Sequence, residues 1–541
     1  MPLPSILALT LASIASSTDA PVPFFNGLGS FHRAITTKSL VAQRYFDQGM
    51  AFVFGFNHDE AIKAFRAAAK ADPNCPMAYW AIANAYGPNI NYPMVDPVHA
   101  AGAWDALTKA KAIASKGSAV EQALIAAQSK RFANPQPEDR SGLDKAYAEA
   151  MREVWKKYPK DPEVGALFAE SLMDLRPWDL WTLDGKPVDI TPEILRTIDS
   201  VLKLNPKHPQ GLHLKIHALE ASPNPVKALD AANKLRDLQP ALGHMVHMPS
   251  HIDIRVGHWV DAETSNAKAI TADTAYRKAV GKLDFYRGYI THNYHMLTFA
   301  AMMRGEGQRA INTMDEGVRI IPTDWAKTYA AFIDAFMVMP VSVRVRFGRW
   351  NEVLSAPDYP EHFPISRALR HGARAVAYAA TGHVAEAWRE QAAFEKMRKA
   401  TPATASWGNN TAGLIFTIES HFISGEILLA EKNLDASIEE LRSAVVAEDQ
   451  VKYNEPPDWI QPTRHTLGAV LVQAHRYKEA VDVYKRDLID HPENGWALKG
   501  LALAYAGLGD KHSLQDYQSR FDKAWKDADL KIGSSCLCVK G

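Results

Sequence analysis

The fold follows from a stretch of 34 residues, 42–75, which reads AQRYFDQGMAFVFGFNHDEAIKAFRAAAKADPNC. Large and small residues occupy fixed places in it: Tyr45, Gly49, Phe52, Ala61, Phe65, Ala68 and Pro73 stand at positions 4, 8, 11, 20, 24, 27 and 32. Small residues let two antiparallel helices approach closely, large side chains fill the space between them, and a proline cannot continue the second helix. The stretch therefore predicts a pair of packed helices.

The same pattern returns along the chain. Further copies start near residues 209, 243, 291, 461 and 495, and weaker copies lie near residues 163, 368 and 418. A period of 34 residues with these large and small positions resembles the tetratricopeptide repeat, a helix–turn–helix unit. The resemblance implies an all-α protein, an α-solenoid that winds as a right-handed superhelix of roughly nine helix pairs with inserted loops.

We expect this solenoid to form a single domain over residues 21–530. Residues 1–20 read as either a signal peptide or a disordered leader, because an apolar run is followed by small residues but lacks a basic start. Secretion and a cytoplasmic location therefore both stay open. Residues 531–541 are expected to be a disordered tail. No membrane span is expected, because no stretch of about 20 apolar residues occurs.

Composition excludes several classes of protein. Of the 541 residues, 47% are apolar and 23% are charged, which is typical of a globular chain. Lys plus Arg and Asp plus Glu are 61 each, so the net charge is zero and a nucleic-acid partner is not expected. The three cysteines, Cys75, Cys536 and Cys538, form no C-x-x-C pair. Nucleotide-binding and serine-hydrolase motifs are also absent from the sequence.

Three insertions interrupt the repeats, at residues 87–97, 174–192 and about 323–365. The second insertion carries Trp178 and Trp181. Aromatic, proline-rich insertions fit two interpretations equally well, namely lids over the groove of the solenoid or surface loops.

Histidines gather on one face of successive helices. In the first helix of a repeat, positions 2, 5, 9, 12 and 13 share a stripe that differs from the packing face. On this stripe stand His213, His217, Glu220, His244, His247, His251, Arg255, His292 and His295. The resemblance to tetratricopeptide proteins implies that this stripe lines the concave groove, where ligands bind.

The spacing of these residues predicts a metal site. His217 and Glu220, His247 and His251, and His292 and His295 are each three or four residues apart, so each pair puts two donors on one helix face. Imidazole and carboxylate donors without thiolate favour Cu or Fe, with Zn as the alternative, and one or two ions fit the count. Pro249, between His247 and His251, predicts a kink in their helix.

Other histidines are interpreted more simply. His213, His244 and His465 are each expected to be supporting or bystander residues, because a single groove histidine is usually hydrogen-bonded or solvated. His58 stands at position 17 of its repeat, where packing between helices is the first interpretation. It also stays a candidate ligand, because a superhelix can bring an early repeat across from the middle ones.

Several motifs extend the resemblance over nearly the whole chain. They are YFDQG at 45–49, GFNHDEA at 55–61, HMVHMPSHI at 244–252, HNYH at 292–295, PPDW at 456–459 and HPENGW at 491–496. With these motifs the chain resembles a group of large tetratricopeptide-repeat proteins found mainly in bacteria. The resemblance implies the fold, and it implies no particular activity.

The site therefore decides the expected function, a metal-dependent enzyme in which an oxidoreductase is favoured over a hydrolase. A small-molecule substrate would lie in the groove, with Glu220 as a ligand or general base and Arg255 or Tyr294 orienting an anionic or phenolic substrate. Two alternatives stay open. One is an interaction scaffold that binds a protein or peptide partner, and the other is a protein that stores or delivers metal.

Overall fold

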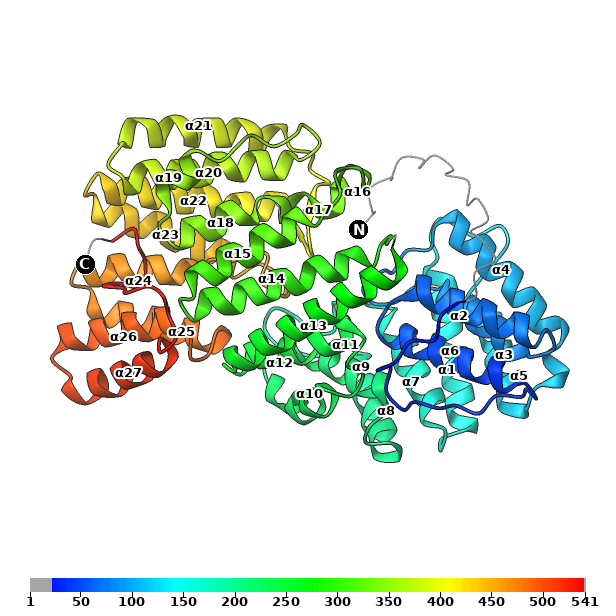
Figure 1. Ribbon diagram of the computed structural model, residues 1–541. Helices are drawn as coiled ribbons and strands as arrows, with labels where there is room; N and C mark the ends of the chain where they lie inside the picture. Colours follow the sequence, from blue (N-terminus) through cyan, green and yellow to red (C-terminus); the bar gives the residue numbers. More distant parts are fainter. Residues whose placement is uncertain (1–21, 282, 540–541) are drawn as a thin grey trace. The chain divides into compact units, whose positions relative to one another are not determined.

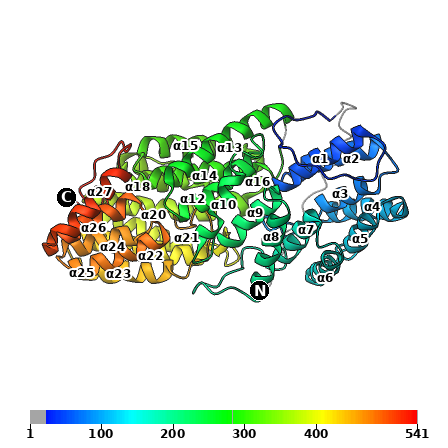
Figure 2. The same ribbon diagram turned by 90° about the horizontal axis from the view of Figure 1, so that it is seen from below.

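The computed structural model describes residues 22–281 and 283–539, most of which are helical. The chain divides into two compact units: Met1–Ser222 with Asp230–Val246 form unit 1, and Pro223–Leu229 with His247–Gly541 form unit 2. Figures 1 and 2 show the helices of each unit from two sides. The predicted leader, residues 1–20, lies outside the described residues. A single solenoid over residues 21–530 stays a prediction.

Unit 1 contains most or all of each of eleven α-helices and one short 3-10 helix. They are α1 (Leu40–Phe54), α2 (His58–Ala71), α3 (Pro76–Ala85), α4 (Pro97–Ala112), η1 (Ala114–Lys116), α5 (Ala119–Gln128), α6 (Ser141–Lys157), α7 (Pro162–Met173), α8 (Thr191–Leu204), α9 (Pro209–Leu219), α10 (Leu229–Leu235) and α11 (Gly243–His247). Helices that follow one another in the chain pack as pairs, including α1 with α2, α3 with α4 and α7 with α8.

Unit 2 continues in the same way. Its elements are η2 (Pro225–Ala228), α12 (Pro249–Arg255), α13 (Trp259–Val280), α14 (Arg287–Met303), α15 (Gly307–Arg319), α16 (Thr323–Thr328), α17 (Ala330–Met337), α18 (Met339–Arg346), α19 (Trp350–Leu354), α20 (Pro364–Ala380), α21 (Val384–Ala400), α22 (Ala412–Ala430), α23 (Leu434–Glu448), α24 (Thr463–Gln473), α25 (Tyr477–Asp490), α26 (Gly495–Leu508) and α27 (Lys511–Ala524). Strands β1 (Ser406–Trp407) and β2 (Asn410–Thr411) form a small antiparallel ribbon.

The prediction of an all-α solenoid built from tetratricopeptide-type helix pairs is confirmed. The predicted repeats that start near residues 42, 291, 418, 461 and 495 coincide with the pairs α1 and α2, α14 and α15, α22 and α23, α24 and α25, and α26 and α27. The expected break at Pro249 is also present, since α11 ends at His247 and α12 begins at Pro249.

Glycine at position 8 of the repeat is required by close packing. A Cβ atom on Gly49 would overlap the ring of Phe65, which stands at position 24 on the partner helix. The same overlap would occur between Gly468 and Tyr484 at the corresponding positions of a later repeat. The two helices of these pairs therefore approach so closely that no larger residue fits.

We expect Gly49→Ala to lower the free energy of unfolding by about 1–3 kcal/mol, because the added methyl group overpacks a closed interface. Gly142→Ala in α6 is the matched control in the same unit, since a Cβ atom there would meet nothing within 4 Å. That control should be neutral or slightly stabilising, because alanine is the better helix former. Urea unfolding of both variants checks this, and equal effects of the two substitutions would contradict it.

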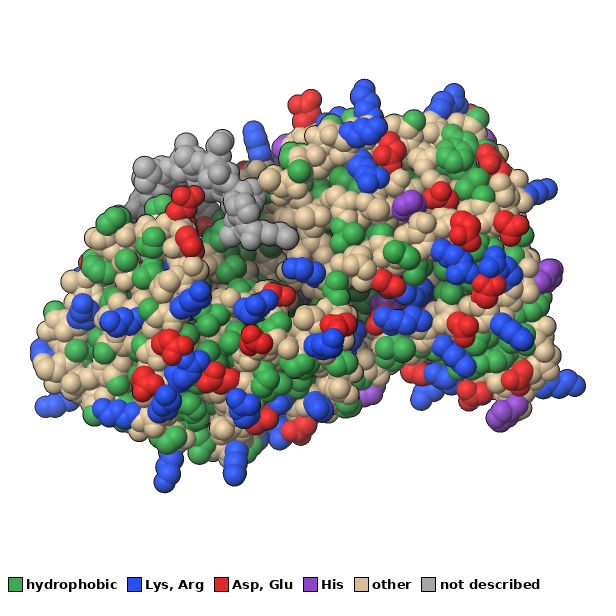
Figure 3. Space-filling model, turned by 180° about the vertical axis from the view of Figure 1, so that it is seen from behind, with side chains coloured by type: hydrophobic (Ala, Val, Ile, Leu, Met, Phe, Trp, Pro, Cys, Tyr) green, Lys and Arg blue, Asp and Glu red, His purple; other side chains and the backbone are tan. Residues whose placement is uncertain are grey.

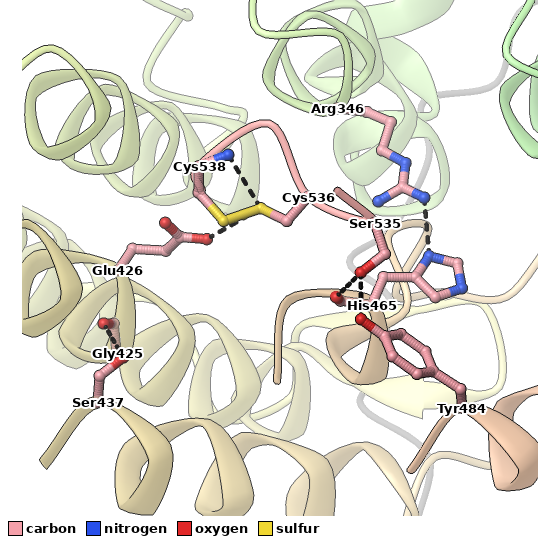
Figure 4. The surroundings of a disulfide bond; sticks show 9 residues. All are labelled: Arg346, Gly425, Glu426, Ser437, His465, Tyr484, Ser535, Cys536 and Cys538. Atoms are coloured by element: carbon pink, nitrogen blue, oxygen red, sulfur yellow. Dashed lines mark hydrogen bonds between the residues drawn. A yellow bond between two sulfur atoms is a disulfide. The ribbon is translucent and has the colours of Figure 1, made fainter. Parts of the chain in front are cut away.

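The predicted disordered tail is wrong for residues 531–539. Ser535 is fully buried, its Oγ donates to the carbonyl oxygen of His465 at 2.7 Å, and the same Oγ lies 2.5 Å from the hydroxyl of Tyr484. Cys536 and Cys538 form a disulfide, with Cys536 Sγ lying 3.8 Å from a carboxyl oxygen of Glu426 (Figure 4). The tail packs because its buried polar groups find hydrogen-bond partners, which no sequence periodicity reveals.

Helix α22, Ala412–Ala430, is long and apolar enough to cross a membrane by length and composition alone. Its mean hydropathy over the best window is 1.3, and 61% of that window is buried inside the structure. Within unit 2 it packs against α20 and α23. A buried core helix meets the same criteria, so length and composition alone do not assign α22 to a membrane.

Two buried carboxyl groups lie on α22, and burial raises the pKa of both Glu419 and Glu426 to about 8. A glutamate in an unfolded chain titrates near about 4.3, so between that pH and 8 the folded protein holds the extra proton. The contribution of such a group to the free energy of unfolding therefore falls as the pH rises through this window.

We expect Glu426→Gln to remove the part of this pH dependence that Glu426 contributes, while Glu419 keeps its own part. The variant should match the parent near pH 5 and exceed its free energy of unfolding by about 2 kcal/mol near pH 8.5, because the amide cannot ionise. Chemical denaturation at several pH values measures the difference. Glu439→Gln, on the exposed surface of α23, is the control. A Glu426→Gln curve parallel to that of the parent would contradict the prediction.

The surface that Figure 3 shows carries basic and acidic side chains interspersed with one another. This distribution agrees with the equal totals of 61 basic and 61 acidic residues.

Candidate metal centre

Two groups of three histidines bring their ring nitrogens within 4.8 Å of one another. The first cluster is His213, His217 and His244 in unit 1, and the second cluster is His247, His251 and His292 in unit 2. All six residues belong to the predicted stripe. Five of them are buried and His292 is half-buried.

In the first cluster, α9 supplies His213 and His217, one helical turn apart, and α11 supplies His244. Nδ1 of His213 lies 2.8 Å from the carbonyl oxygen of Phe54. Because a carbonyl oxygen only accepts, this Nδ1 carries the hydrogen and Nε2 holds the lone pair. Nε2 of His213 lies 3.2 Å from Nε2 of His244.

His217 is oriented in the same way. Its Nδ1 lies 2.9 Å from Oε1 of Glu220, the residue that follows α9, and both side chains are buried. A carboxylate opposite Nδ1 fixes the tautomer of the imidazole with its hydrogen on Nδ1. The lone pair is then on Nε2, where it can bind a metal ion.

Two aromatic residues in unusual backbone conformations pack on the first cluster. Phe56 has φ = 53° and its ring centroid lies 4.7 Å from that of His213 and 5.3 Å from that of His244. Trp178 has φ = 60° and lies 5.3 Å from the ring of His217. Positive φ is costly for bulky residues and concentrates at functional sites, so both conformations mark this region.

A small cavity that is partly open to solvent lies beside His217. It is lined by Ile90, Met173, Arg176, Trp178, Leu180, Trp181, His217, Glu220 and Ala221. Indole nitrogens hold the wall in place: Trp178 donates to Oδ1 of Asn91 at 3.1 Å, and Trp181 donates to the carbonyl oxygen of Ala218 at 2.9 Å. The insertions 87–97 and 174–192 thus cover the histidine stripe of α9, which favours the lid interpretation over surface loops.

In the second cluster, Nε2 of His247 lies 2.7 Å from Nε2 of His251. The ring of His292, from α14, lies 4.6 Å from that of His247 and 5.7 Å from that of His251, measured between centroids. Nδ1 of His247 lies 2.6 Å from Oδ1 of Asn266, whose amide nitrogen donates to the carbonyl oxygen of Ala262 at 2.8 Å. Nδ1 of His251 lies 2.7 Å from a carboxylate oxygen of Glu455.

These contacts fix where the protons are. The amide nitrogen of Asn266 is committed to Ala262, so the amide oxygen faces His247 and accepts from its Nδ1. The carboxylate of Glu455 lies 2.7 Å from Nδ1 of His251, and its negative charge favours a proton on that nitrogen. With both rings neutral, the two Nε2 lone pairs point at each other, and a positive charge between or on the rings is needed to stabilise that contact.

The structure brings five of the predicted metal ligands into these clusters or against them: His217, Glu220, His247, His251 and His292. Among the described residues, His58 and His295 join neither cluster. Burial lowers the pKa of each of these two rings to about 3. His58 lies edge-on to Phe56, and His295 lies edge-on to Phe336 at 5.6 Å. Both therefore fit packing between helices better than ligation.

The two residues expected to orient a substrate are engaged elsewhere. Tyr294 packs on α15, where a Cβ atom on Gly317 would lie 2.8 Å from the Cβ atom of Tyr294. It fills a core position of the helix pair, so the structure gives no support to the predicted role. The guanidinium of Arg255 lies over the ring of Tyr453 at 5.4 Å and donates to the carbonyl oxygen of Asp490 at 3.4 Å.

Sequence reasoning undervalued His213 and His244, which we interpreted as supporting residues, and it missed Asn266 and Glu455. Asn266 carried a signal. It stands at position 24 of its repeat, where other repeats carry Phe65, Met314 and Tyr484. A fully buried amide in the place of a large apolar side chain marks a position selected for hydrogen bonding.

The fold and the two clusters define a tetratricopeptide-type α-solenoid with buried histidine clusters. No family model matches the chain, and no curated protein matches it. The human IFIT1 dimer with m7Gppp-AAAA is similar in structure at 14% identity and a TM-score of 0.34, covering 91% of both chains. Yeast Tom70 is similar at 13% identity and a TM-score of 0.29, covering 90% of this chain and 92% of that one.

A third similar structure is the Cut9–Hcn1 complex, at 12% identity and a TM-score of 0.30, covering 90% of this chain and 74% of the other. Likeness at this level leads to no conclusion about the ligands of this chain. The fold assignment rests on the helix pairs themselves.

Proposed function

We propose that this protein is a metal-dependent enzyme whose ions are held by the histidine clusters, with oxidoreductase chemistry at copper or iron as the first choice. One observation carries the proposal: His213, His217, His247 and His251 each turn Nδ1 toward an oxygen atom. Within each cluster, Nε2 atoms then face one another and can act together as metal ligands.

This orientation is the one that metal-ligating histidines adopt. A ligating imidazole almost always donates its second ring N–H to a carboxylate, an amide or a carbonyl oxygen, which fixes the ring and raises its basicity. An isolated buried histidine needs only one such bond. Three ring nitrogens converging within 4.8 Å, in each of two clusters, favour ligation over ordinary polar packing.

The donor set limits the metal. Imidazole nitrogens suit copper, iron and zinc, and neither cluster contains a thiolate. A bound copper or iron ion supplies electron transfer, whereas zinc supplies polarisation of a substrate or of water. The redox metals are the first choice, and zinc is the alternative.

The cavity beside His217 is the proposed substrate site. Glu220 holds the proton of His217 at Nδ1 and also lines the cavity, so it is placed to accept a proton from a bound molecule. Trp178 and Trp181 exclude water from one side. Arg176, whose guanidinium also pairs with Asp179, lines the same cavity and could orient an anionic or phenolic substrate in place of Arg255 or Tyr294.

A scaffold is the competing function, because binding a protein or peptide partner is the common role of tetratricopeptide solenoids. Among the similar structures, IFIT1 is bound to a capped RNA and Cut9 is in complex with Hcn1. A metal storage or delivery protein is the third alternative. It predicts bound metal that passes quickly to a chelator, whereas an enzyme retains its ion through turnover.

Titration of metal-stripped protein against a chromophoric chelator tests the proposal. We expect Cu²⁺ or Zn²⁺ to bind with a Kd of about 1 μM or lower, at one or two ions per chain. Ascorbate should bleach the Cu²⁺ signal in electron paramagnetic resonance, and air should restore it. Failure of every tested metal to compete with the chelator would return the chain to the scaffold class.

Asn266→Ala is expected to weaken metal binding about 10–100-fold, because the amide oxygen that orients His247 is lost while the ligands stay. The same competition titration measures the change. Asn312→Ala, on the exposed face of α15, is the matched control and should bind as the parent does. An Asn266→Ala protein with parental affinity would contradict the assignment of His247.

A further inference from the structure

A second cavity lies within unit 2, away from the residues of both histidine clusters. It is partly open to solvent and is formed by α18, α20, α22, β1 and the segment that precedes α24. The three helices can be followed in Figure 1. Its lining residues are Met339, Ser342, Val345, Leu369, Ala373, Val376, Trp407, Glu419, Phe422, Asp458, Trp459, Ile460 and Gln461.

The side chains that line this cavity are mostly apolar, and its ionisable groups are all acidic. Three aromatic rings, Trp407, Phe422 and Trp459, stand among aliphatic side chains. Two carboxyl groups, Glu419 and Asp458, also face the cavity, but the described residues that line it include no lysine, arginine or histidine. A cavity with two buried acids and no protein cation is suited to a positively charged ligand.

Glu419 is the important group. The residue is 7% exposed, and its side chain makes no hydrogen bond or ion pair with any residue that the structure describes. Gly372 on α20 makes room for it, because a Cβ atom there would overlap Oε1 of Glu419. A buried carboxyl group without a partner is costly, so it calls for a ligand that pairs with it.

Asp458 is held differently. Its two carboxyl oxygens accept from Nδ2 of Asn410 at 2.7 Å and from Nδ2 of Asn454 at 2.5 Å. These bonds fix the group at the cavity wall. Asp458 therefore adds a carboxyl group at a defined place, while Glu419 offers oxygens that make no hydrogen bond among the described residues.

We propose that this cavity binds a small organic cation, a protonated amine with an apolar body, whose ammonium group pairs with Glu419. The apolar body would occupy the space among the aromatic and aliphatic side chains. Indole and phenyl faces attract cations, so the three rings stabilise the same charge. A neutral molecule of the same shape would leave Glu419 unpaired, and an anion would be repelled.

The titration behaviour agrees with this assignment. Burial raises the pKa of Glu419 to about 8 and that of Asp458 to about 7, as expected of acids that no protein cation stabilises. The inference does not depend on the metal proposal, because no residue of this cavity belongs to either histidine cluster.

Isothermal titration of the full chain with benzylamine, and with benzyl alcohol as its neutral counterpart, tests the inference. We expect benzylamine to bind with a Kd of about 1 mM or lower and at least about 10-fold more tightly than benzyl alcohol. Glu419→Gln should abolish that difference. Glu426→Gln is the matched control, because it removes a buried carboxyl group from the same helix without changing the cavity lining.

Gly372→Ala provides a second variant that retains the charge of Glu419 but displaces its carboxylate. Gly372→Ala should weaken benzylamine binding as well. If Glu419→Gln does not fold, this variant tests whether the ammonium group pairs with Glu419. The proposal is overturned if the parent binds no benzylamine, if benzyl alcohol binds equally well, or if the folded variants at Glu419 and Gly372 bind as the parent does.

Discussion

Replacing His247 and His251 together by alanine is expected to abolish metal binding at the second cluster. The two Nε2 atoms lie 2.7 Å apart and supply two of its three donors. With only His292 left, the affinity of this cluster should fall at least about 100-fold. Competition titration of the double variant measures the loss, and circular dichroism checks that it stays folded.

A matched pair of histidines provides the control. His371 and His421 lie on α20 and α22, and each places Nδ1 2.7 Å from a glutamate, Glu390 and Glu440 respectively. They belong to neither cluster among the described residues. The His371→Ala/His421→Ala protein should bind metal as the parent does. If both double variants lose metal equally, or neither does, the second cluster is not the site.

The second large effect is expected for Asp487→Asn, which should lower the free energy of unfolding by about 3–5 kcal/mol at neutral pH. Asp487 is buried and lies 2.9 Å from Nε2 of His465. The other nitrogen of that ring lies 2.7 Å from the guanidinium of Arg346, which covers the ring of Trp496. Removing the carboxylate leaves a buried cation without its counter-charge.

The pH dependence of this effect follows from the carboxyl group. Burial alone would raise the pKa of Asp487, but His465 and His491 beside it hold that pKa well below its usual range. Its stabilisation is therefore present above the unfolded pKa of about 3.9 and is lost as the pH falls below that value. The difference between Asp487→Asn and the parent should shrink in acid.

Urea unfolding of the variant at neutral and acidic pH measures both effects. Asp490→Asn is the neighbouring control, because its ion pair with Arg486 lies near the surface and should contribute at most about 1 kcal/mol. An Asp487→Asn protein as stable as Asp490→Asn would show that the buried network contributes little.

Most of the fold could be predicted from the sequence, because a 34-residue period fixes both the helices and their packing. Gly49 against Phe65 and Gly468 against Tyr484 occupy the same two positions of the repeat, so one pattern predicts both contacts. The ordered tail could not be predicted. Ser535 is held by hydrogen bonds to Tyr484 and His465, which lie far away in the sequence.

The candidate site was predictable in part for a similar reason. Helical spacing placed His247 and His251 on one stripe, and Pro249 marked the break between their helices. Spacing does not show which way a ring turns, so Asn266 and Glu455, which fix the second cluster, were missed. His244 was interpreted as a single groove histidine, although its Nε2 lies 3.2 Å from Nε2 of His213.

X-ray absorption of the full chain loaded with Zn²⁺ tests the central claim most directly. We predict a first coordination shell of nitrogen atoms near about 2.0 Å, with the outer scattering of at least three imidazole rings. Sulfur atoms near about 2.3 Å would instead indicate binding at Cys536 and Cys538 after reduction of their disulfide, since these sulfurs approach Glu426 closely enough to form another donor group. A shell of sulfur, or of oxygen atoms without imidazole scattering, would contradict the account of the two histidine clusters.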